Sequence, residues 1–316
     1  MNDKSIRVRV PGTSANCGPG FDTLGIACTI YNELELTLKE EPGIVFDVEG
    51  EGAENIPQDE RNVVWRSVCY LLEQAGATDK YRGGILRMSN EVPLSRGLGS
   101  SATAIVAGLK AANVLVGNMF NRRELLQFAT KIEGHPDNVA PAIFGGFTVN
   151  IVSKGRAQCF SFLPKLRMKM VAAVPDFPLP TKTAREVLPE MVSRQDAIFN
   201  IGRSSLLVAA LCKGNEHFLR QSFEDALHQP YRAELIPGMM EVFSAAKSAG
   251  AMGATLSGAG PCLMAYVLER DRCAREVGDA MVEAFRRNGV TAKALVLSLD
   301  TRGAHIINDE SSRIGA

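Results

Sequence analysis

The chain lacks the features that would favour a membrane or a nucleic acid as its partner. Lys and Arg number 35 and Asp and Glu also number 35, so the formal net charge is zero and no overall charge favours polyanions or membrane surfaces. No apolar run approaches the roughly 18 residues of a membrane span. The first ten residues are charged and strand-like, which does not predict a signal peptide. We expect a cytoplasmic protein that binds neither nucleic acid nor membrane.

Patterns typical of metal sites and disulfide frameworks are missing too. The seven cysteines form no Cys-x-x-Cys pair, which argues against both a zinc site and a disulfide framework. Reduced thiols are therefore expected. The four histidines (His135, His217, His228 and His305) lie too far apart to show the spacing of metal ligands.

The pattern of the chain predicts two domains of the α+β class. Its 316 residues exceed the usual size of one domain, of about 100–200 residues, and we place the division at 1–160 and 161–316. Strand and helix patterns mix without strict alternation, which favours α+β over a doubly wound sheet. The predicted strands are 6–10, 31–38, 44–48, 84–89, 147–152, 157–163, 168–174, 253–257, 262–268 and 292–299. The predicted helices are 62–74, 101–116, 121–133, 193–211, 217–228, one ending at Gly250, and 271–287.

The most informative stretch runs from Val92 to Thr103 and sets two glycines and two serines before an alanine-rich helix. Glycine lets a ligand approach the backbone closely, and a helix start offers unpaired N–H groups to an anion. A phosphate cradle is therefore predicted. The pattern Gly-x-Gly-x-x-Ala also fits a dinucleotide fingerprint, but Pro93 breaks the approach and no acidic residue follows at the right distance. No Walker A lysine is present, and a plain glycine turn remains the simplest alternative.

Taken whole, Pro93 to Ala102 resembles the phosphate-binding motif of the GHMP kinases. The resemblance implies ATP as phosphate donor and a serine hydroxyl, Ser100 or Ser101, that reaches Mg²⁺. It also implies phosphate contacts from the whole loop. That loop consists of Pro93, Leu94, Ser95, Arg96, Gly97, Leu98, Gly99, Ser100, Ser101, Ala102 and Thr103.

Three further stretches extend this resemblance over most of the chain. Residues 253–261 look like the third motif of the superfamily, and residues 11–22 resemble its first motif in the form found in the homoserine kinases. Residues 133–147 are similar to the homoserine kinases and unlike sugar or mevalonate kinases, which place an aspartate where this chain has Asn138. The resemblance therefore implies the homoserine kinase family and L-homoserine as acceptor.

The charges of such a substrate fit residues of this chain. An arginine fork suits a carboxylate. Each of Arg185 and Arg232 taken alone is better explained as lying on a solvated helix face, but the resemblance assigns the carboxylate contact to both. Asp22 is the candidate partner of the ammonium group. The other residues implied around the substrate are Asn16, His135, Asn138, Thr181 and Gly258.

The resemblance implies catalytic roles for Glu133, Asn138 and Arg185. Glu133 matches the metal-ligand glutamate, and Mg²⁺ bound to phosphates needs only one or two protein carboxylates. No clear general base is present. Phosphoryl transfer through a loose transition state asks little of the nucleophile, so we expect Asn138 to orient the hydroxyl, with Asp137 as the reserve candidate for a base.

The implied fold is the two-domain GHMP kinase fold. It has an N-terminal domain with a left-handed β-α-β crossover and a C-terminal ferredoxin-like domain. A homodimer and inhibition by threonine are also implied. The alternatives are a GHMP kinase for another small alcohol, such as mevalonate or shikimate, and a non-catalytic sensor of ATP or an amino acid. Two departures from the family pattern are Ser95, with no expected effect, and Cys262, where a hydroxyl residue is more common.

Overall fold

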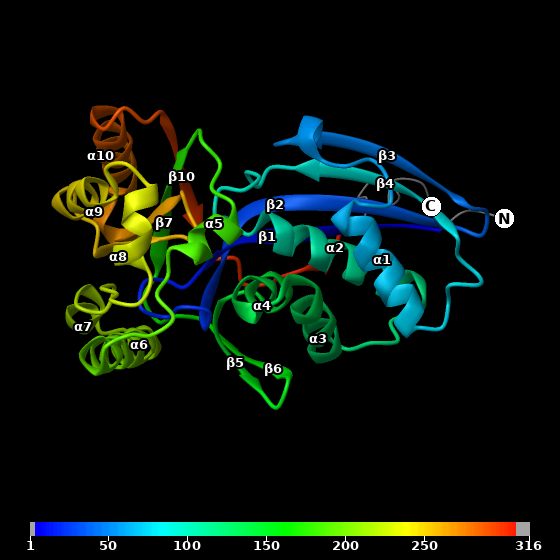
Figure 1. Ribbon diagram of the computed structural model, residues 1–316, viewed down its shortest axis with the longest axis horizontal. Coiled ribbons are helices and arrows are strands. Elements are labelled where there is room, and N and C mark those ends of the chain that lie inside the picture. The colour runs from blue at the N-terminus through cyan, green and yellow to red at the C-terminus, as the bar shows by residue number, and fades with distance from the viewer. Residues whose placement is uncertain (1–3, 308–316) are drawn as a thin grey trace.

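The computed structural model describes residues 4–307, which fold around two β-sheets that lie side by side (Figure 1). The larger sheet has the order β11-β1-β2-β4-β3, and β5 pairs with β2 and carries β6. All its pairings are antiparallel except that of β3 with β4, which are connected through α1. Its strands are β1 (Ser5–Ala15), β2 (Leu24–Lys39), β3 (Gly43–Gly50), β4 (Gly83–Asn90), β5 (Phe147–Ser153), β6 (Arg156–Phe162) and β11 (His305–Ile306).

Four helices gather on one side of this sheet (Figure 1). Their apolar side chains pack with those of the strands and form a core around Leu36, Leu86 and Ile105, in which α2 is buried on most sides between the strands and the other helices. The helix starts are fixed locally: Asn62 caps α1 and Asn121 forms a capping box with Glu124 at α3. These helices are α1 (Val63–Gln74), α2 (Ser100–Leu115), α3 (Arg122–Glu133) and α4 (Pro136–Phe144), preceded by a 3₁₀ turn at Ala53–Asn55.

The second sheet is antiparallel, with the order β10-β7-β9-β8. Its strands are β7 (Met168–Pro175), β8 (Gly253–Leu256), β9 (Leu263–Leu268) and β10 (Ala292–Ser298). Helices α9 and α10 pack on it through a core that includes Val242, Met281 and Phe285. The helices of this half are α5 (Thr181–Glu186), α6 (Arg194–Lys213), α7 (Glu216–Arg220), α8 (Gln229–Arg232), α9 (Met239–Ser248) and α10 (Ala274–Arg287), with 3₁₀ turns at Ala233–Leu235 and Glu269–Asp271.

A third apolar cluster joins the two sheets. It combines Leu24 and Phe147 of the larger sheet with Met264 of the smaller sheet and Leu207 of α6. Strand β11 returns to pair with β1, so the last described strand belongs to the first sheet. The division of the chain at residue 160 stays a prediction.

Most predicted elements are present, and the departures are local. The hairpin of β5 and β6 and the β–β–α–β order after residue 250 are confirmed. The predicted helix 217–228 is wrong. Helix α7 ends at Arg220, and Asp225 then accepts the backbone N–H groups of Leu227, His228 and Gln229, which starts the separate helix α8. Helix α5, which carries Arg185, was not predicted.

Candidate active site

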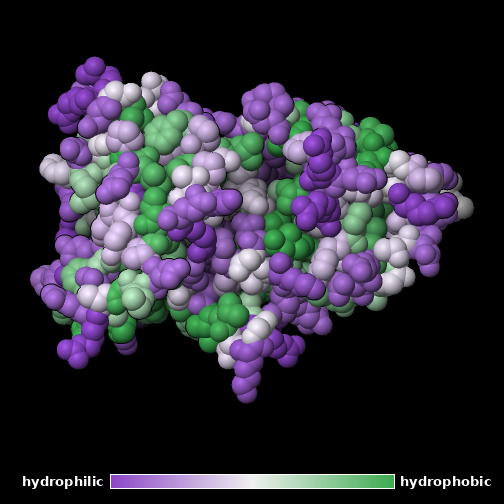
Figure 2. All heavy atoms as spheres, in the orientation of Figure 1, coloured by the Kyte–Doolittle hydropathy of each residue, from purple (hydrophilic) through white to green (hydrophobic). Residues whose placement is uncertain are grey.

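A cleft between the two halves collects most of the predicted site residues (Figure 2). Its cavity is about 360 Å³, which is in the range of small-ligand sites. The predicted residues that line it are Asn16, Asp22, Leu94, Ser95, Arg96, Gly97, Gly99, Ser100, Ser101, Glu133, His135, Asn138, Thr181, Arg185, Arg232 and Gly258.

Four residues of the predicted phosphate loop have other surroundings. Leu98 is fully buried in the apolar cluster that joins the two sheets, and Ala102 is fully buried in the core of the larger sheet. The hydroxyl of Thr103 donates to the Ser100 carbonyl. Pro93 lines a separate hollow on the other side of the loop. Arg96 does line the cleft, but its guanidinium donates to the backbone carbonyls of Leu94, Pro175 and Asp176, so its charge serves to fix the loop.

The glycine-rich loop is held by the other two motifs. Positive φ angles at Ser95, Gly97 and Gly99 turn the backbone three times within five residues, and a non-glycine residue rarely takes this conformation. The Ser257 hydroxyl donates to the Gly97 carbonyl, and the Thr13 N–H donates to the Leu98 carbonyl. The three motifs, which lie far apart in the sequence, therefore form one wall of the cleft.

The third motif contacts the first motif as well. Asn16 donates from Nδ2 to the Gly258 carbonyl at 2.8 Å and accepts the Asp22 N–H at 3.0 Å. Asn16 thus positions the loop that carries Asp22. The thiol of Cys262 is buried in the core between the sheets, so this departure from the family pattern lies away from the cleft.

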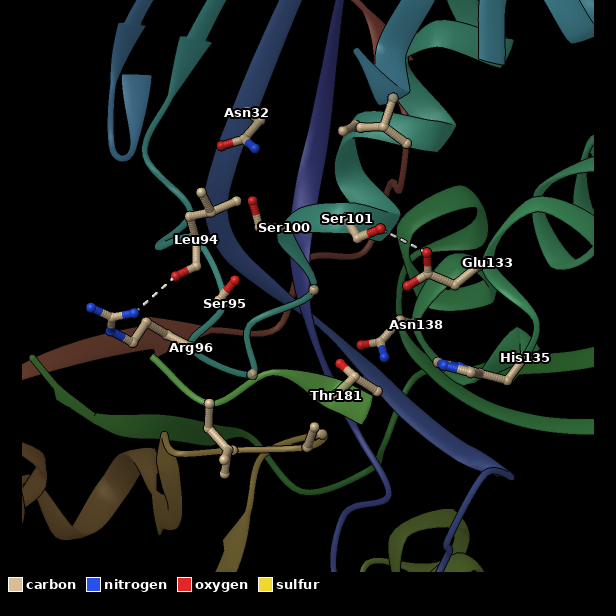
Figure 3. A pocket seen from close by; sticks show the side chains of 18 of the residues that line it. Asn32, Leu94, Ser95, Arg96, Ser100, Ser101, Glu133, His135, Asn138 and Thr181 are labelled. Carbon is tan, nitrogen blue, oxygen red and sulfur yellow. Dashed lines mark hydrogen bonds between the residues drawn. The ribbon is translucent and has the colours of Figure 1, made fainter. Parts of the chain in front are cut away.

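Helix α2 begins at Ser100 and presents its N-terminus to the cleft, where Ser101 meets Glu133 (Figure 3). The Ser101 hydroxyl donates to Glu133 Oε2 at 2.7 Å. Gly134 ends α3 with a φ of 99°, which leaves the Glu133 carboxylate at the negative end of that helix, an unfavourable place for an anion. Burial raises the pKa of Glu133, and the hydrogen bond from Ser101 opposes this rise. Such a carboxylate is well suited to a cation.

Asn138 lies on α4 and is held by a residue that the sequence did not single out. The Thr13 hydroxyl donates to Asn138 Oδ1 at 2.8 Å. This bond directs the Asn138 amide nitrogen, which can only donate, and Asn138 lines the cleft. No signal in the sequence marks Thr13 beyond its place in the first motif.

His135 and Asp137 form a close pair at the start of α4. Their Nδ1 and Oδ1 atoms lie 2.5 Å apart, and Asp137 is 2% exposed. Burial lowers the pKa of His135, but the hydrogen bond and charge of Asp137 outweigh burial, so the pKa is raised. The short contact and the raised pKa of His135 both favour an ion pair between the two side chains.

The charged part of the cleft combines residues of both halves. Arg185 donates to both carboxylate oxygens of Asp22, at 3.0 and 2.8 Å. Arg232 is 2% exposed yet lines the cleft. Burial and the charge of Arg185 lower the pKa of Arg232 to about 10. The Phe21 ring lies against both guanidinium groups, 5.6 Å from that of Arg185 and 5.2 Å from that of Arg232, and cation–π contacts of this kind are favourable.

An apolar lining completes the cleft, and of its side chains only Leu94 was predicted from the sequence. Its side chains are Ile56, Pro57, Val63, Met88 and Leu94. They come from the segment before α1 and the first residue of that helix, from β4, and from the loop that follows β4. No sequence motif joins these segments, because only the folded sheet brings them together. Asn55, Asn62 and Asn90 add polar groups beside them.

Comparison with known proteins gives the class of this fold and site. The family model of the GHMP kinases N terminal domain matches residues 62–146, and the model of the GHMP kinases C terminal domain matches residues 207–287. A solved mevalonate kinase from L. major, 18% identical, superposes with a TM-score of 0.71 over 96% of this chain and 98% of that chain. The chain has the two-domain α+β fold of the GHMP kinases, as predicted.

Closer relatives narrow the class. The homoserine kinase of Desulfitobacterium hafniense is 42% identical over 96% of this chain and 100% of its own length. That of Carboxydothermus hydrogenoformans is 43% identical over 95% of this chain and 96% of its own. The crystal structure of homoserine kinase from Cytophaga hutchinsonii is 31% identical, with a TM-score of 0.88 over 97% of this chain and 98% of that chain. The chain belongs to the homoserine kinase family.

Proposed function

We propose that the cleft holds ATP along its apolar lining and glycine-rich loop, and L-homoserine against Asp22, Arg185 and Arg232. As a member of the homoserine kinase family, the chain catalyses ATP-dependent phosphorylation of homoserine to O-phosphohomoserine. The observation that carries the acceptor site is the joint lining of one cleft by an anion, Asp22, and two guanidinium groups. This combination suits a zwitterion that carries a carboxylate and an ammonium group.

The donor site combines an apolar surface with backbone dipoles. Ile56, Val63 and Met88 suit a flat base, and the N-terminus of α2 attracts the negative phosphates. Ser101 and Glu133 supply a hydroxyl and a carboxylate 2.7 Å apart, which are oxygen ligands of the kind that Mg²⁺ takes beside phosphates. A bound Mg²⁺ would neutralise charge that develops on the phosphate oxygens.

Positioning accounts for the acceptor chemistry. The substrate hydroxyl oxygen forms a bond to the γ-phosphorus while the bond from that phosphorus to ADP breaks, and the hydroxyl proton passes to an oxygen of the transferred phosphoryl group late in a loose transition state. Asn138 cannot take up a proton, but its amide nitrogen can donate to the hydroxyl oxygen and aim it at the phosphorus. Well-oriented reactants can gain up to about 7–11 kcal/mol in favourable cases, which leaves little for a base to supply.

A coupled ADP-release assay tests this proposal. With Mg²⁺ present, turnover should depend on L-homoserine and should be far lower with mevalonate, shikimate or L-serine. Absence of homoserine-dependent turnover would refute the proposal and favour the sensor alternative. Arg185→Ala should raise the KM for homoserine and spare the KM for ATP. Lys182→Ala is the matched control, because Lys182 lies on the same helix with its side chain 89% exposed.

Other parts of the expectation stay predictions. They are the homodimer, the inhibition by threonine and the cytoplasmic location. In the part of the chain that the structure describes, no helix is both long and apolar enough to span a membrane.

A further inference from the structure

A network of buried polar side chains lies directly behind the acceptor site. The side chains of Asp225 and His228 are 0% exposed, and Arg232, four residues after His228, is 2% exposed. His228 and Arg232 belong to the start and end of the short helix α8. Burying charged groups is costly unless they are paired and hydrogen-bonded, so the contacts of these groups need an explanation.

His228 bridges Arg232 and the first motif. Its Nε2 lies 2.8 Å from the Gly18 carbonyl oxygen, and its Nδ1 lies 3.3 Å from an Arg232 nitrogen. A carbonyl can only accept and a guanidinium can only donate, so the ring has its proton on Nε2 and is neutral. Burial lowers the pKa of His228 against the opposing charge of Asp225, which agrees with this form. Arg232 also donates to the Ala184 and Gly258 carbonyls, so its guanidinium is held at several points.

Asp225 extends the network to the loop that precedes Asp22. It accepts Asn200 Nδ2 at 3.0 Å, and the same nitrogen donates to the Pro19 carbonyl at 2.9 Å. Ser204 donates to that carbonyl too. The Phe21 ring stacks on His228, with centroids 5.1 Å apart, and the two guanidinium groups lie against Phe21 as described above.

The network therefore touches both charged partners of the proposed substrate. It fixes the guanidinium of Arg232 on one side and the backbone leading to Asp22 on the other. His228 is neutral, is bonded at both ring nitrogens and has no exposed surface, so it is not placed to exchange a proton with the reactants. Its contacts instead decide where Arg232 points.

We propose that Asp225 and His228 are positioning residues for recognition of the substrate carboxylate. His228 orients Arg232 through Nδ1, and Asp225 holds His228 and the Pro19–Phe21 loop in register. This inference rests on the proposed function, because it takes the carboxylate of L-homoserine as the ligand of Arg232.

The test compares L-homoserine with 3-aminopropan-1-ol, which has the same hydroxyl and ammonium groups but no carboxylate. The readout is selectivity, the ratio of the two kcat/KM values. A hydrogen bond to a charged group contributes about 1.5–3 kcal/mol, so His228→Leu should lower selectivity by roughly 10- to 100-fold. The KM for ATP should stay at the wild-type value. A general disturbance of the structure would change the KM for ATP as well.

Two amide variants separate positioning from packing. His228→Asn keeps an acceptor near the place of Nδ1 and should retain most of the selectivity. His228→Gln reaches towards the Gly18 carbonyl, lacks that acceptor and should lose selectivity as His228→Leu does. Because both amides are polar and similar in size, they remain informative if His228→Leu does not fold. Asp225→Asn should lower selectivity as well.

His217→Leu on α7 is the matched control, since His217 is exposed and bonds to Gln221 on the same surface. It should leave selectivity unchanged. Equal selectivity in His228→Asn and His228→Gln, or wild-type selectivity in a folded His228→Leu protein, would overturn the inference. A wild-type protein without homoserine turnover would overturn the proposed function as well. The two failures are distinguishable, because failure of the proposed function is seen in the wild type and failure of this inference is seen only in the variants.

Discussion

Replacing Thr13 by Val should slow phosphoryl transfer although Thr13 touches neither reactant in the proposed mechanism. Valine keeps the shape of the side chain and removes the hydroxyl that donates to Asn138 Oδ1 at 2.8 Å. Without that bond the carboxamide of Asn138 is free to rotate, and its oxygen can face the substrate hydroxyl in place of its nitrogen. The substrate hydroxyl would then lose the Asn138 N–H donor that orients it towards the γ-phosphorus.

The size of the effect follows from the kind of bond. A neutral hydrogen bond contributes about 0.5–1.5 kcal/mol, which corresponds to a fall in kcat of roughly 2- to 12-fold. Asn138→Ala removes the donor itself, and we expect a fall of roughly 10- to 100-fold, or about 1.4–2.7 kcal/mol. Neither change should alter the KM for ATP, because neither residue belongs to the apolar lining.

The double variant tests whether Thr13 acts through Asn138. In the Asn138→Ala background, Thr13→Val should have almost no further effect on kcat, because its partner is already gone. Initial rates from the ADP-release assay at saturating ATP and homoserine give the four kcat values that the cycle needs, for the wild type, the two single variants and the double variant. Independent effects that multiply in the double variant would show that Thr13 and Asn138 do not act as one unit.

The same assay tests whether Asn138 orients the substrate hydroxyl or Asp137 acts as a general base. Asp137 is buried and lies against His135, so we expect Asp137→Asn to disturb the His135 pair without removing a general base. If Asn138→Ala keeps kcat within a few-fold of wild type while Asp137→Asn abolishes it, the proposed mechanism is wrong.

Three other predictions concern the metal site, pH and the loop. Glu133→Gln should raise the Mg²⁺ concentration for half-maximal rate by roughly tenfold or more, measured by Mg²⁺ titration; an unchanged requirement would remove Glu133 from the metal site. Burial lowers the pKa of His228 from 6.5. Its contribution to the free energy of unfolding is therefore complete above pH 6.5 and is lost as pH falls through the lowered pKa. Between neutral and acidic pH, the melting temperature should fall more steeply in wild type than in His228→Asn. Gly97→Ala should destabilise far more than Gly117→Ala. Both glycines have positive φ, which costs an alanine about 1–2 kcal/mol. A Cβ at Gly97 would also collide with the Ser257 carbonyl oxygen, while one at Gly117 meets nothing within 4 Å. Equal melting temperatures would contradict the packing argument.

Local patterns predicted the elements well where the chain itself supplies the signal. The capping box of Asn121 and Glu124 marks the start of α3 correctly, and alternation marks β2. The segment 217–228 has helical spacing, yet it breaks after Arg220. There the side chain of Asp225 accepts the backbone N–H groups of the next residues, a local side-chain-to-backbone arrangement that competes with the helix.

The motifs predict the charged residues of the site but not the side chains that hold and surround them. Asp22, Arg185 and Arg232 all line one cleft, although more than 200 residues separate the first from the last. The sequence assigns no role to Phe21 or Asp225, because their roles depend on which side chains face them. Apart from Leu94, the apolar lining was missed for the same reason: any core strand or helix start offers such residues.

The glycine-rich loop shows where sequence reasoning stopped short. The sequence predicts that its glycines make room for a phosphate, and the loop does line the cleft. In the structure, however, a Cβ at Gly97 would collide with the Ser257 carbonyl, and one at Gly99 would collide with the Thr13 hydroxyl. The glycines therefore make room for the other two motifs as well. Since the Thr13 hydroxyl also orients Asn138, a side chain at Gly99 would disturb the acceptor as well as the phosphate donor. The loop that first indicated a bound triphosphate is thus coupled, through one hydroxyl group, to the residue that aims the nucleophile.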